Sequence, residues 1–306
     1  MELSINKKYL IFELVKSFTK DDRPYIRVVL LDSKGEQYNG IMFDSNKLDF
    51  EPEKGDIVEI SGSLQNYNGQ MQIKINNMLK GSIDDLYDFL PKSKYDPDLM
   101  LNELMDIVYK NLDCEYTIKL MDMFFNDDAT IRQFIKHPAA KNVHHAYVGG
   151  LLEHTLSVVK LAIILSDYYC EQVDKNILIA GAIFHDLGKI YELDITKGFD
   201  YTDSGKLLGH LILGIDLVRG YISKIESFPE SKANLILHLV ASHHGYIEFG
   251  AIKKPKTYEA LILHHIDDLD AKINNFGILF EKDKVQTGWS SYDRLLERQI
   301  FKHKDN

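Results

Sequence analysis

The histidines of this chain are concentrated in one region. Eleven of the twelve lie between His137 and His265, and none precedes His137. They occur in short clusters with carboxylates or with each other: Glu153-His154, His185-Asp186, His210, His243-His244 and His264-His265-Ile-Asp267. Imidazole and carboxylate groups without thiolate are ligands suited to Mn²⁺, Fe²⁺, Mg²⁺ or Zn²⁺ rather than copper. The clusters therefore predict a site for divalent metal ions.

The elements expected around these residues are helices. His154 and His210 lie near the starts of two predicted helices, His243 and His244 end a third, and Asp267 lies on the next. Inward-facing ligands on several helices are how metal sites are built in helical bundles. Asp186 directly follows His185, and a carboxylate has two oxygens with which it can bridge two cations.

The order His, His-Asp, His, His-His, Asp resembles the HD superfamily of metal-dependent phosphohydrolases. More narrowly, four segments resemble the YhaM family of 3′-to-5′ exoribonucleases. They are Ala139-Ala-Lys-Asn-Val-His144-His145-Ala-Tyr-Val-Gly-Gly-Leu-Leu-Glu-His154-Thr, Phe184-His-Asp-Leu-Gly-Lys189 with Leu-Gly-His210, and Ile262-Leu-His-His-Ile-Asp267-Asp-Leu-Asp270-Ala-Lys272. That family places an OB-fold before the HD domain.

The resemblance implies two metal sites. His154, His185, Asp186 and Asp267 would hold one ion, and His210 with His243 or His244 would hold a second, bridged by Asp186. Two ions, Mn²⁺ favoured, would lie about 4 Å apart and flank the attacking and leaving oxygens of a phosphodiester. Lys189 would neutralise a phosphate oxygen. For His144 and His145 three roles stay open: they could orient the substrate phosphate, donate to the leaving oxygen, or simply pack. The expected products are nucleoside 5′-monophosphates.

Each of these residues has a structural alternative. His185 and Asp186 could form a helix cap or a buried ion pair, although an unliganded buried aspartate is costly. Asp267 competes with Asp268 and Asp270. Of these, Asp270 shares a helix face with Asp267 because the two are three residues apart. His264 could support a ligand or belong to the core, and Lys189 could be solvated.

The first eighty residues predict a small barrel. Short segments rich in β-branched and aromatic residues alternate with turn signals, and Asn68-Gly69 suits a type I′ hairpin turn. The expected strands are Tyr9–Phe18, Tyr25–Leu31, Glu36–Phe43, Ile57–Leu64 and Met71–Ile75. About five strands without a convincing helix fit an OB-fold. We therefore expect a multidomain α+β chain, with an OB-fold at 1–82, a linker at 83–98 and an all-α HD domain at 99–306 (core about 140–276).

From Leu99 onward a helical period dominates. The expected helices are Leu99–Leu112, Tyr116–Phe125, Gly150–Tyr169, Asn176–Phe184, His210–Ile225, Lys232–Ser242, Tyr258–Phe276 and Asp293–Phe301.

Aromatic residues of the barrel could stack on single-stranded bases. Most aromatic residues at strand positions are expected in the core. Tyr67 is preferred because it lies beside the hairpin tip, and Arg27 and Lys74 are candidate phosphate contacts.

Composition constrains the partners. The net charge is −10, and residues 1–80 carry 11 basic and 12 acidic side chains, so no basic excess marks a nucleic-acid binder. A polyanionic substrate would then need a local basic groove or bound cations. The two cysteines form no disulfide framework, no apolar run is long enough to cross a bilayer, and the first residues lack a signal peptide. We expect a cytoplasmic protein without a membrane partner.

The leading hypothesis is a metal-dependent 3′-to-5′ exonuclease on single-stranded RNA, with single-stranded DNA as an open second substrate. One alternative is an HD-type phosphohydrolase of nucleotides. Another is a single-strand-binding protein whose HD domain is only structural. An acidic chain acting on a polyanion also suggests a homo-oligomer that forms a channel.

Overall fold

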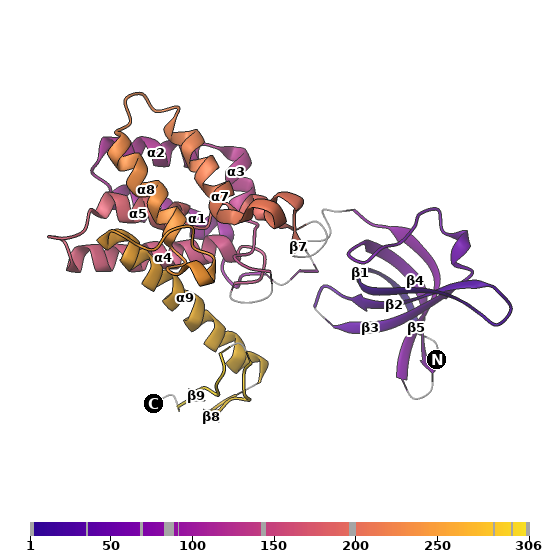
Figure 1. The fold of residues 1–306 in the computed structure, drawn as a ribbon. Helices are drawn as coiled ribbons and strands as arrows, with labels where there is room; N and C mark the ends of the chain where they lie inside the picture. Colours follow the sequence, from indigo (N-terminus) through magenta and orange to yellow (C-terminus); the bar gives the residue numbers. More distant parts are fainter. Residues whose placement is uncertain are drawn as a thin grey trace. The chain divides into compact units, whose positions relative to one another are not determined.

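The structure is a computed structural model that describes residues 3–34, 36–67, 70–82, 89–90, 92–141, 145–195, 200–283, 285–294 and 296–303. The chain divides into two compact units, one of Met1–Pro91 with Asp194–Asp200, the other of Lys92–Leu193 with Tyr201–Asn306 (Figure 1). Each unit is described by itself.

The first unit is a closed five-stranded barrel. Its strands are β1 (Leu3–Phe18), β2 (Pro24–Leu31), β3 (Gln37–Phe43), β4 (Ile57–Tyr67) and β5 (Gln70–Lys80), and a 3-10 turn, η1 (Ser45–Lys47), follows β3. The strand order is β1-β2-β3-β5-β4, closed by antiparallel pairing of β1 with β4, and β3 runs parallel to β5. This is the expected OB-type barrel, although β1 begins six residues before the predicted strand. The predicted turn at Asn68-Gly69 lies outside the described residues.

Alternation of apolar and polar residues places one side of each strand inside the barrel. Ile11, Ile26, Leu30, Ile60 and Ile73 are fully or almost fully buried there. A bulge between Ile11 and Glu13 shifts the register of β1 against β2. Such a bulge increases the local twist, which helps so small a sheet to close on itself.

The second unit is helical. Its helices are α1 (Pro97–Asn111), α2 (Glu115–Phe125), α3 (Asp128–Phe134), α4 (Gly150–Tyr168), α5 (Lys175–Phe184), α6 (Lys189–Glu192), α7 (Asp203–Ile222), α8 (Glu230–Ser242) and α9 (Tyr258–Lys282), with a 3-10 turn, η3 (Ile247–Phe249). Short strands also occur: β6 (Leu193–Asp194), β7 (Asp200–Tyr201), β8 (Gly288–Trp289) and β9 (Phe301–Lys302).

The helix predictions missed α3 and the four-residue α6 and placed one helix wrongly. α3 was missed because its seven residues are too few to show a clear helical period in the sequence. The helix expected at Asp293–Phe301 is wrong. Its last residue instead pairs with Trp289 in the β8–β9 ladder, where the two rings lie 5.1 Å apart.

The helical core positions the histidines. α5 is apolar on all sides, and every residue from Ile177 to Phe184 is buried. Phe184 packs edge-on against Phe124, with ring centroids 5.6 Å apart. The chain therefore delivers His185 and Asp186, directly after Phe184, into the interior of the bundle. Among the described residues, no helix is long and apolar enough to cross a membrane.

Candidate functional site

The structure brings the seven predicted metal ligands into one region, from five helices or helix ends. His154 lies on α4, His185 and Asp186 directly follow α5, His210 lies on α7, His243 and His244 directly follow α8, and Asp267 lies on α9. They form two groups with metal-binding spacing: His154, His185, Asp186 and Asp267, and the three histidines 210, 243 and 244.

The first group is almost completely buried. His154 Nε2 lies 3.1 Å from His185 Nε2 and 3.1 Å from Asp267 Oδ1. Asp186 Oδ2 lies 3.6 Å from His154 Nε2 and 3.5 Å from His185 Nε2. Two imidazoles and two carboxylates thus direct one atom each toward a common point.

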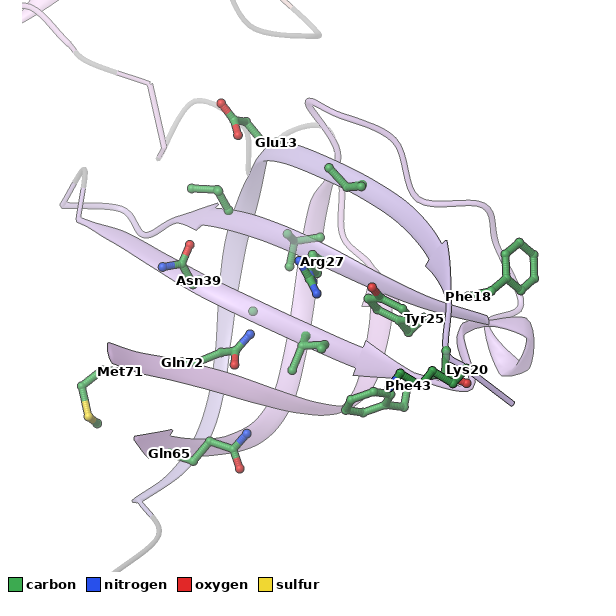
Figure 2. Close-up of a pocket in the computed structure, with 16 residues that line it drawn as sticks. Glu13, Phe18, Lys20, Tyr25, Arg27, Asn39, Phe43, Gln65, Met71 and Gln72 are labelled. Atoms are coloured by element: carbon green, nitrogen blue, oxygen red, sulfur yellow. The ribbon is translucent and has the colours of Figure 1, made fainter. Parts of the chain in front are cut away.

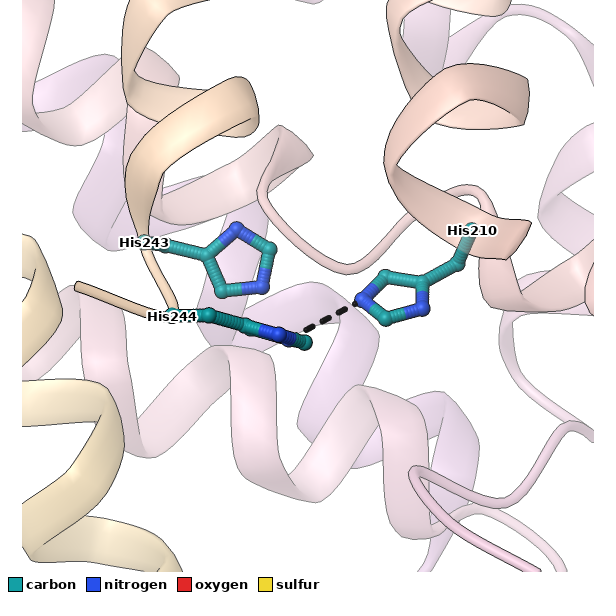
Figure 3. Close-up of side chains that lie close together, drawn as sticks. All are labelled: His210, His243 and His244. Carbon is teal, nitrogen blue, oxygen red and sulfur yellow. Dashed lines mark hydrogen bonds between the residues drawn. The ribbon is translucent and has the colours of Figure 1, made fainter. Parts of the chain in front are cut away.

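The second group faces the other oxygen of Asp186. Figure 3 shows His210 approaching from α7 and the adjacent pair His243 and His244 from the end of α8. His210 Nε2 lies 3.2 Å from His244 Nε2. Asp186 Oδ1 lies 3.5 Å from His210 Nε2 and 3.4 Å from His243 Nε2. Asp186 therefore stands between the groups with one oxygen toward each.

All five imidazoles present Nε2 to the centre because each Nδ1 is paired elsewhere. His185, His243 and His244 hold Nδ1 against the backbone oxygens of Ala182, Val240 and Phe249, at 2.9, 3.0 and 2.9 Å. His154 and His210 hold it against the carboxylates of Asp270 and Glu192, at 2.7 and 3.1 Å. An Nδ1–H that donates outward leaves the Nε2 lone pair for a metal, which is the arrangement of ligating histidines in metalloproteins.

Buried polar atoms at the centre test whether a metal fits. Asp186 Oδ1 and His243 Nε2 have no hydrogen-bond partner among the described residues, and both are shielded from solvent. Leaving such atoms unpaired is costly. A divalent cation, drawn to carboxylate and imidazole ligands, would satisfy both atoms, so the residues present fit a metal.

The protonation states also suit a metal. Burial lowers the pKa of His243 to about 3, and burial likewise lowers the pKa values of His185 and His244, so these imidazoles are neutral. Burial opposes ionisation of Asp186, but nearby Lys189 and the histidines outweigh it and hold its pKa well below the usual range. Metals bind neutral imidazoles and ionised carboxylates.

His154 is the exception. Burial disfavours its protonation, but hydrogen bonds to Asp267 and Asp270 outweigh burial and raise its pKa to about 10. In the absence of a metal, this imidazole carries the positive charge that compensates the carboxylates.

Asp270 connects His154 with His145. Asp270 Oδ2 lies 2.7 Å from His154 Nδ1 and 3.1 Å from His145 Nε2, and Oδ1 accepts a short hydrogen bond from Ser157. The predicted catalytic role of His145 does not fit this position. Its side chain is buried behind His154, with Nδ1 2.9 Å from Tyr147 Oη. These contacts suit a residue that orients the candidate ligand His154 through Asp270 better than one that contacts a substrate.

Glu192 contacts Nδ1 of His210, as Asp270 contacts Nδ1 of His154. Gly209, with φ +72°, interrupts α7, and the helix resumes at His210. Glu192 Oε1 accepts from the backbone N–H of His210 at 3.0 Å and lies 3.1 Å from its Nδ1. One carboxylate oxygen therefore caps the resumed helix and orients the imidazole that begins it.

A pocket of about 570 Å³ opens onto the centre. Asp186, His210, His243, His244 and Asp267 line it, and so does Lys189, whose Nζ lies 2.5 Å from Asp186 Oδ2. Lys141 and Lys272 also line the pocket. The neighbouring acid Asp268 is ion-paired with Lys272 at 2.6 Å, which leaves Asp267 as the acid of α9 directed at the centre.

Other predicted residues have different outcomes. His144 lies outside the described residues. Glu192 and Ser157 were missed by the sequence reasoning, since a lone acid and a lone hydroxyl carry no motif. Asp270 was weighed as a competitor of Asp267, and His264 as a support or a core residue. His264 Nδ1 lies 2.8 Å from the backbone oxygen of His243.

The barrel carries a groove of about 740 Å³ on the outer face of its strands (Figure 2). Tyr25 and Phe43 are cross-strand partners at one end of it, with ring centroids 5.9 Å apart. Arg27, a predicted phosphate contact, also lines the groove. Its guanidinium lies 5.4 Å from the Tyr25 ring centroid. Phe43 is 48% exposed, and Phe18 beside the groove is 68% exposed.

The two other predicted strand contacts have different outcomes. Lys74 is exposed on β5 but does not line it, and the side chain of Tyr67 lies outside the described residues. The alternation of buried and exposed residues along the strands could have identified this surface. Tyr25 and Phe43 are adjacent in sequence to the buried Ile26 and Met42 and therefore face the opposite side of the sheet.

Two comparisons with known proteins bear on these units. A solution structure of the second OB-fold domain of replication protein A from Methanococcus maripaludis is similar to part of the chain, with 24% sequence identity over 26% of this chain and 83% of that chain, and a TM-score of 0.21. Residues 151–272 match the model of the family described as HD domain. All seven clustered ligands lie inside this match. The helical unit therefore contains an HD domain, the domain of a superfamily of metal-dependent phosphohydrolases.

Proposed function

We propose that this protein is a metal-dependent 3′-to-5′ exoribonuclease that hydrolyses single-stranded RNA, and also single-stranded DNA, to nucleoside 5′-monophosphates. One observation carries the proposal. Asp186 stands between two groups of side chains with one oxygen toward each, and five imidazoles direct Nε2 toward the same centre. That is the donor set of a two-ion phosphodiesterase site.

The residues of the two groups would each hold one ion. His154, His185 and Asp267 would hold the first, His210, His243 and His244 the second, and Asp186 both. Bound divalent ions, with Mn²⁺ favoured, supply Lewis acidity to phosphoryl oxygens and acidify water. The ligand set combines nitrogen and oxygen atoms and lacks thiolate, as Mn²⁺ and Fe²⁺ sites do.

Side chains of the pocket would position the phosphate. Lys189 Nζ already lies 2.5 Å from Asp186, so an ammonium group stands next to the carboxylate between the two groups. From there it would donate to a non-bridging phosphate oxygen. Lys141 and Lys272 line the same pocket, where Lys272 is already ion-paired with Asp268. Bound cations would therefore supply most of the positive charge that the acidic chain lacks.

The groove on the barrel supports a strand as the substrate. Exposed aromatic faces beside an arginine are how proteins hold single strands, since each base can stack and each phosphate can meet a cation. Tyr25, Phe43 and Arg27 provide this combination. A phosphohydrolase of free nucleotides has no use for such a groove. The direction of cleavage and the preference for RNA rest on the sequence resemblance to the YhaM exoribonucleases.

The decisive experiment follows one reaction with two labels. Single-stranded RNA and DNA of the same sequence, labelled at the 5′ or the 3′ end, are incubated with the full-length protein and Mn²⁺, Mg²⁺ or EDTA. We expect a ladder that shortens from the 3′ end, release of 5′-mononucleotides, and no reaction in EDTA. Asp186→Asn should abolish turnover, whereas Asp216→Asn, an exposed acid on α7, should not change it.

Degradation in EDTA, or full activity of Asp186→Asn, would contradict the proposal. Hydrolysis of free nucleotides with labelled strands left intact would point to a nucleotide phosphohydrolase. Strand binding that survives chelation, without turnover in any metal, would leave only a binding protein.

A further inference from the structure

An aromatic turn follows the last two histidine ligands. Tyr246 directly precedes η3 and Phe249 is its last residue, and their side chains are 48% and 65% exposed. Both line the pocket that opens onto the metal centre. Large exposed aromatic side chains in a polar pocket do not bind metal or phosphate. They would instead contact a different part of the substrate.

The turn is rigid. Phe249 and Ala251 both donate backbone N–H groups to Tyr246 O, at 3.0 and 3.1 Å. Gly245 adopts φ +76°, and a Cβ there would approach the His264 ring to 2.3 Å, so the backbone lies directly against that imidazole. The Tyr246 ring is placed edge-on to both neighbours, 5.7 Å from Phe249 and 5.8 Å from His264. Its face is therefore held in place in the free protein.

The same turn is tied to a ligand. His244 Nδ1 lies 2.9 Å from Phe249 O, so the backbone that carries the Phe249 ring also orients an imidazole of the second group. A phosphate held at the centre would then have an aromatic surface at a defined position beside it. The neighbouring Ile247 is 66% exposed on the same turn but does not line the pocket.

The pocket thus combines two chemistries. Lysines and the metal ligands suit a phosphate, and the two aromatic rings suit a flat apolar group attached near that phosphate. A nucleobase has such a face, and every base has one, so stacking would be tolerant of sequence.

We propose that Tyr246 and Phe249 form a nucleobase subsite that stacks the base of the terminal nucleotide while its phosphodiester lies at the metal centre. This inference rests on the proposed function and identifies the part of the substrate that the pocket recognises beyond phosphate. The two residues act by binding the substrate base, and they contact no metal.

The test compares substrates that differ only in one base. One RNA ends in a 3′ adenosine and the other in an abasic ribose, and release of the first residue by the full-length protein with Mn²⁺ is measured as kcat/KM. We expect the wild type to prefer the base-bearing end by about tenfold, within the range that stacking one base contributes. The variant Tyr246→Leu with Phe249→Leu keeps apolar bulk and should reduce the ratio to about one, as stacking is lost. Ile247→Ala is the matched control and should retain the wild-type ratio.

A binding measurement separates this inference from the proposed reaction. Adenosine 5′-monophosphate should bind the Mn²⁺-loaded protein about tenfold tighter than ribose 5-phosphate, and the double leucine variant should lose that difference. If no strand is cleaved but this difference holds, the subsite stands and the exonuclease proposal falls. If strands are cleaved with no preference for the base, or the double variant keeps the preference, the subsite is refuted and the nuclease stands.

Discussion

Replacement of Glu192 should weaken one of the two metal groups and leave the other intact. Glu192 Oε1 accepts from both the backbone N–H and Nδ1 of His210, and the Glu192 side chain is mostly buried. In Glu192→Ala both donors lose their acceptor, and His210 begins the helical segment that resumes after Gly209. The imidazole is then free to rotate and to change tautomer.

The magnitude follows from the contacts. Removing a residue that orients a ligand typically costs 10- to 100-fold in metal affinity, about 1.4–2.7 kcal/mol. Loss of the hydrogen bond to the backbone leaves one buried N–H unpaired, which lowers the free energy of unfolding by about 1–3 kcal/mol. Glu192→Gln is the matched control. Its amide oxygen can accept both N–H groups, so metal affinity should change by less than about fivefold.

Calorimetric titration of the metal-free protein with Mn²⁺ measures both groups at once. We expect two classes of site in the wild type and in Glu192→Gln, and selective weakening of one class in Glu192→Ala. The activity of Glu192→Ala at limiting Mn²⁺ should fall together with the affinity of the weakened site and should recover as the Mn²⁺ concentration is raised. Equal weakening of both classes, or an unchanged isotherm, would refute the argument that Glu192 acts through His210.

Three further outcomes follow from the geometry. Chelation should lower Tm by about 5–10 °C, because a site filled to 100 times its Kd contributes about 2.7 kcal/mol and each kcal/mol shifts a domain of this size by 2–4 °C; an unchanged Tm would argue against a resident metal. The pKa of His154 is raised to about 10, so a metal must displace a proton there. The apparent affinity of the protein for the metal should therefore rise about tenfold per pH unit between pH 7 and 8.5, and a pH-independent calorimetric Kd would contradict this. Tyr25→Ala and Phe43→Ala should each weaken binding of single-stranded RNA by about 1–3 kcal/mol, as measured by fluorescence anisotropy, whereas Phe12→Ala, exposed outside the groove, should not; equal loss in all three would remove the groove as the binding face.

Much of the fold was predictable because its signals are local. Alternation and turn residues marked all five barrel strands, and the apolar period marked most helices. The exceptions were short or non-local elements. α3 has only seven residues, and the segment from Asp293 to Phe301 is held in place by pairing with Gly288–Ser290, which no local pattern reveals.

The metal ligands were predictable for a different reason. Their residue types and order along the chain resemble the HD superfamily, and that resemblance grouped His154, His185, Asp186 and Asp267 before any geometry was known. What the order does not contain is orientation. That both oxygens of Asp186 are used, and that every Nδ1 is occupied, depends on helices far apart in sequence.

The supporting residues required the tertiary structure. His145 precedes His154 in a motif that suggested catalysis, yet its ring faces Asp270 from behind the ligand. Glu192 belongs to no motif and becomes important only because α6 and α7 pack together, and Tyr25 and Phe43 form a surface only where β2 pairs with β3. The sequence by itself thus determined the residue types that could bind metal, which is a property of side-chain chemistry. Only the tertiary structure decided which of them lie where they could ligate a metal, orient a ligand or contact a substrate, since those positions depend on distances and directions between separate elements.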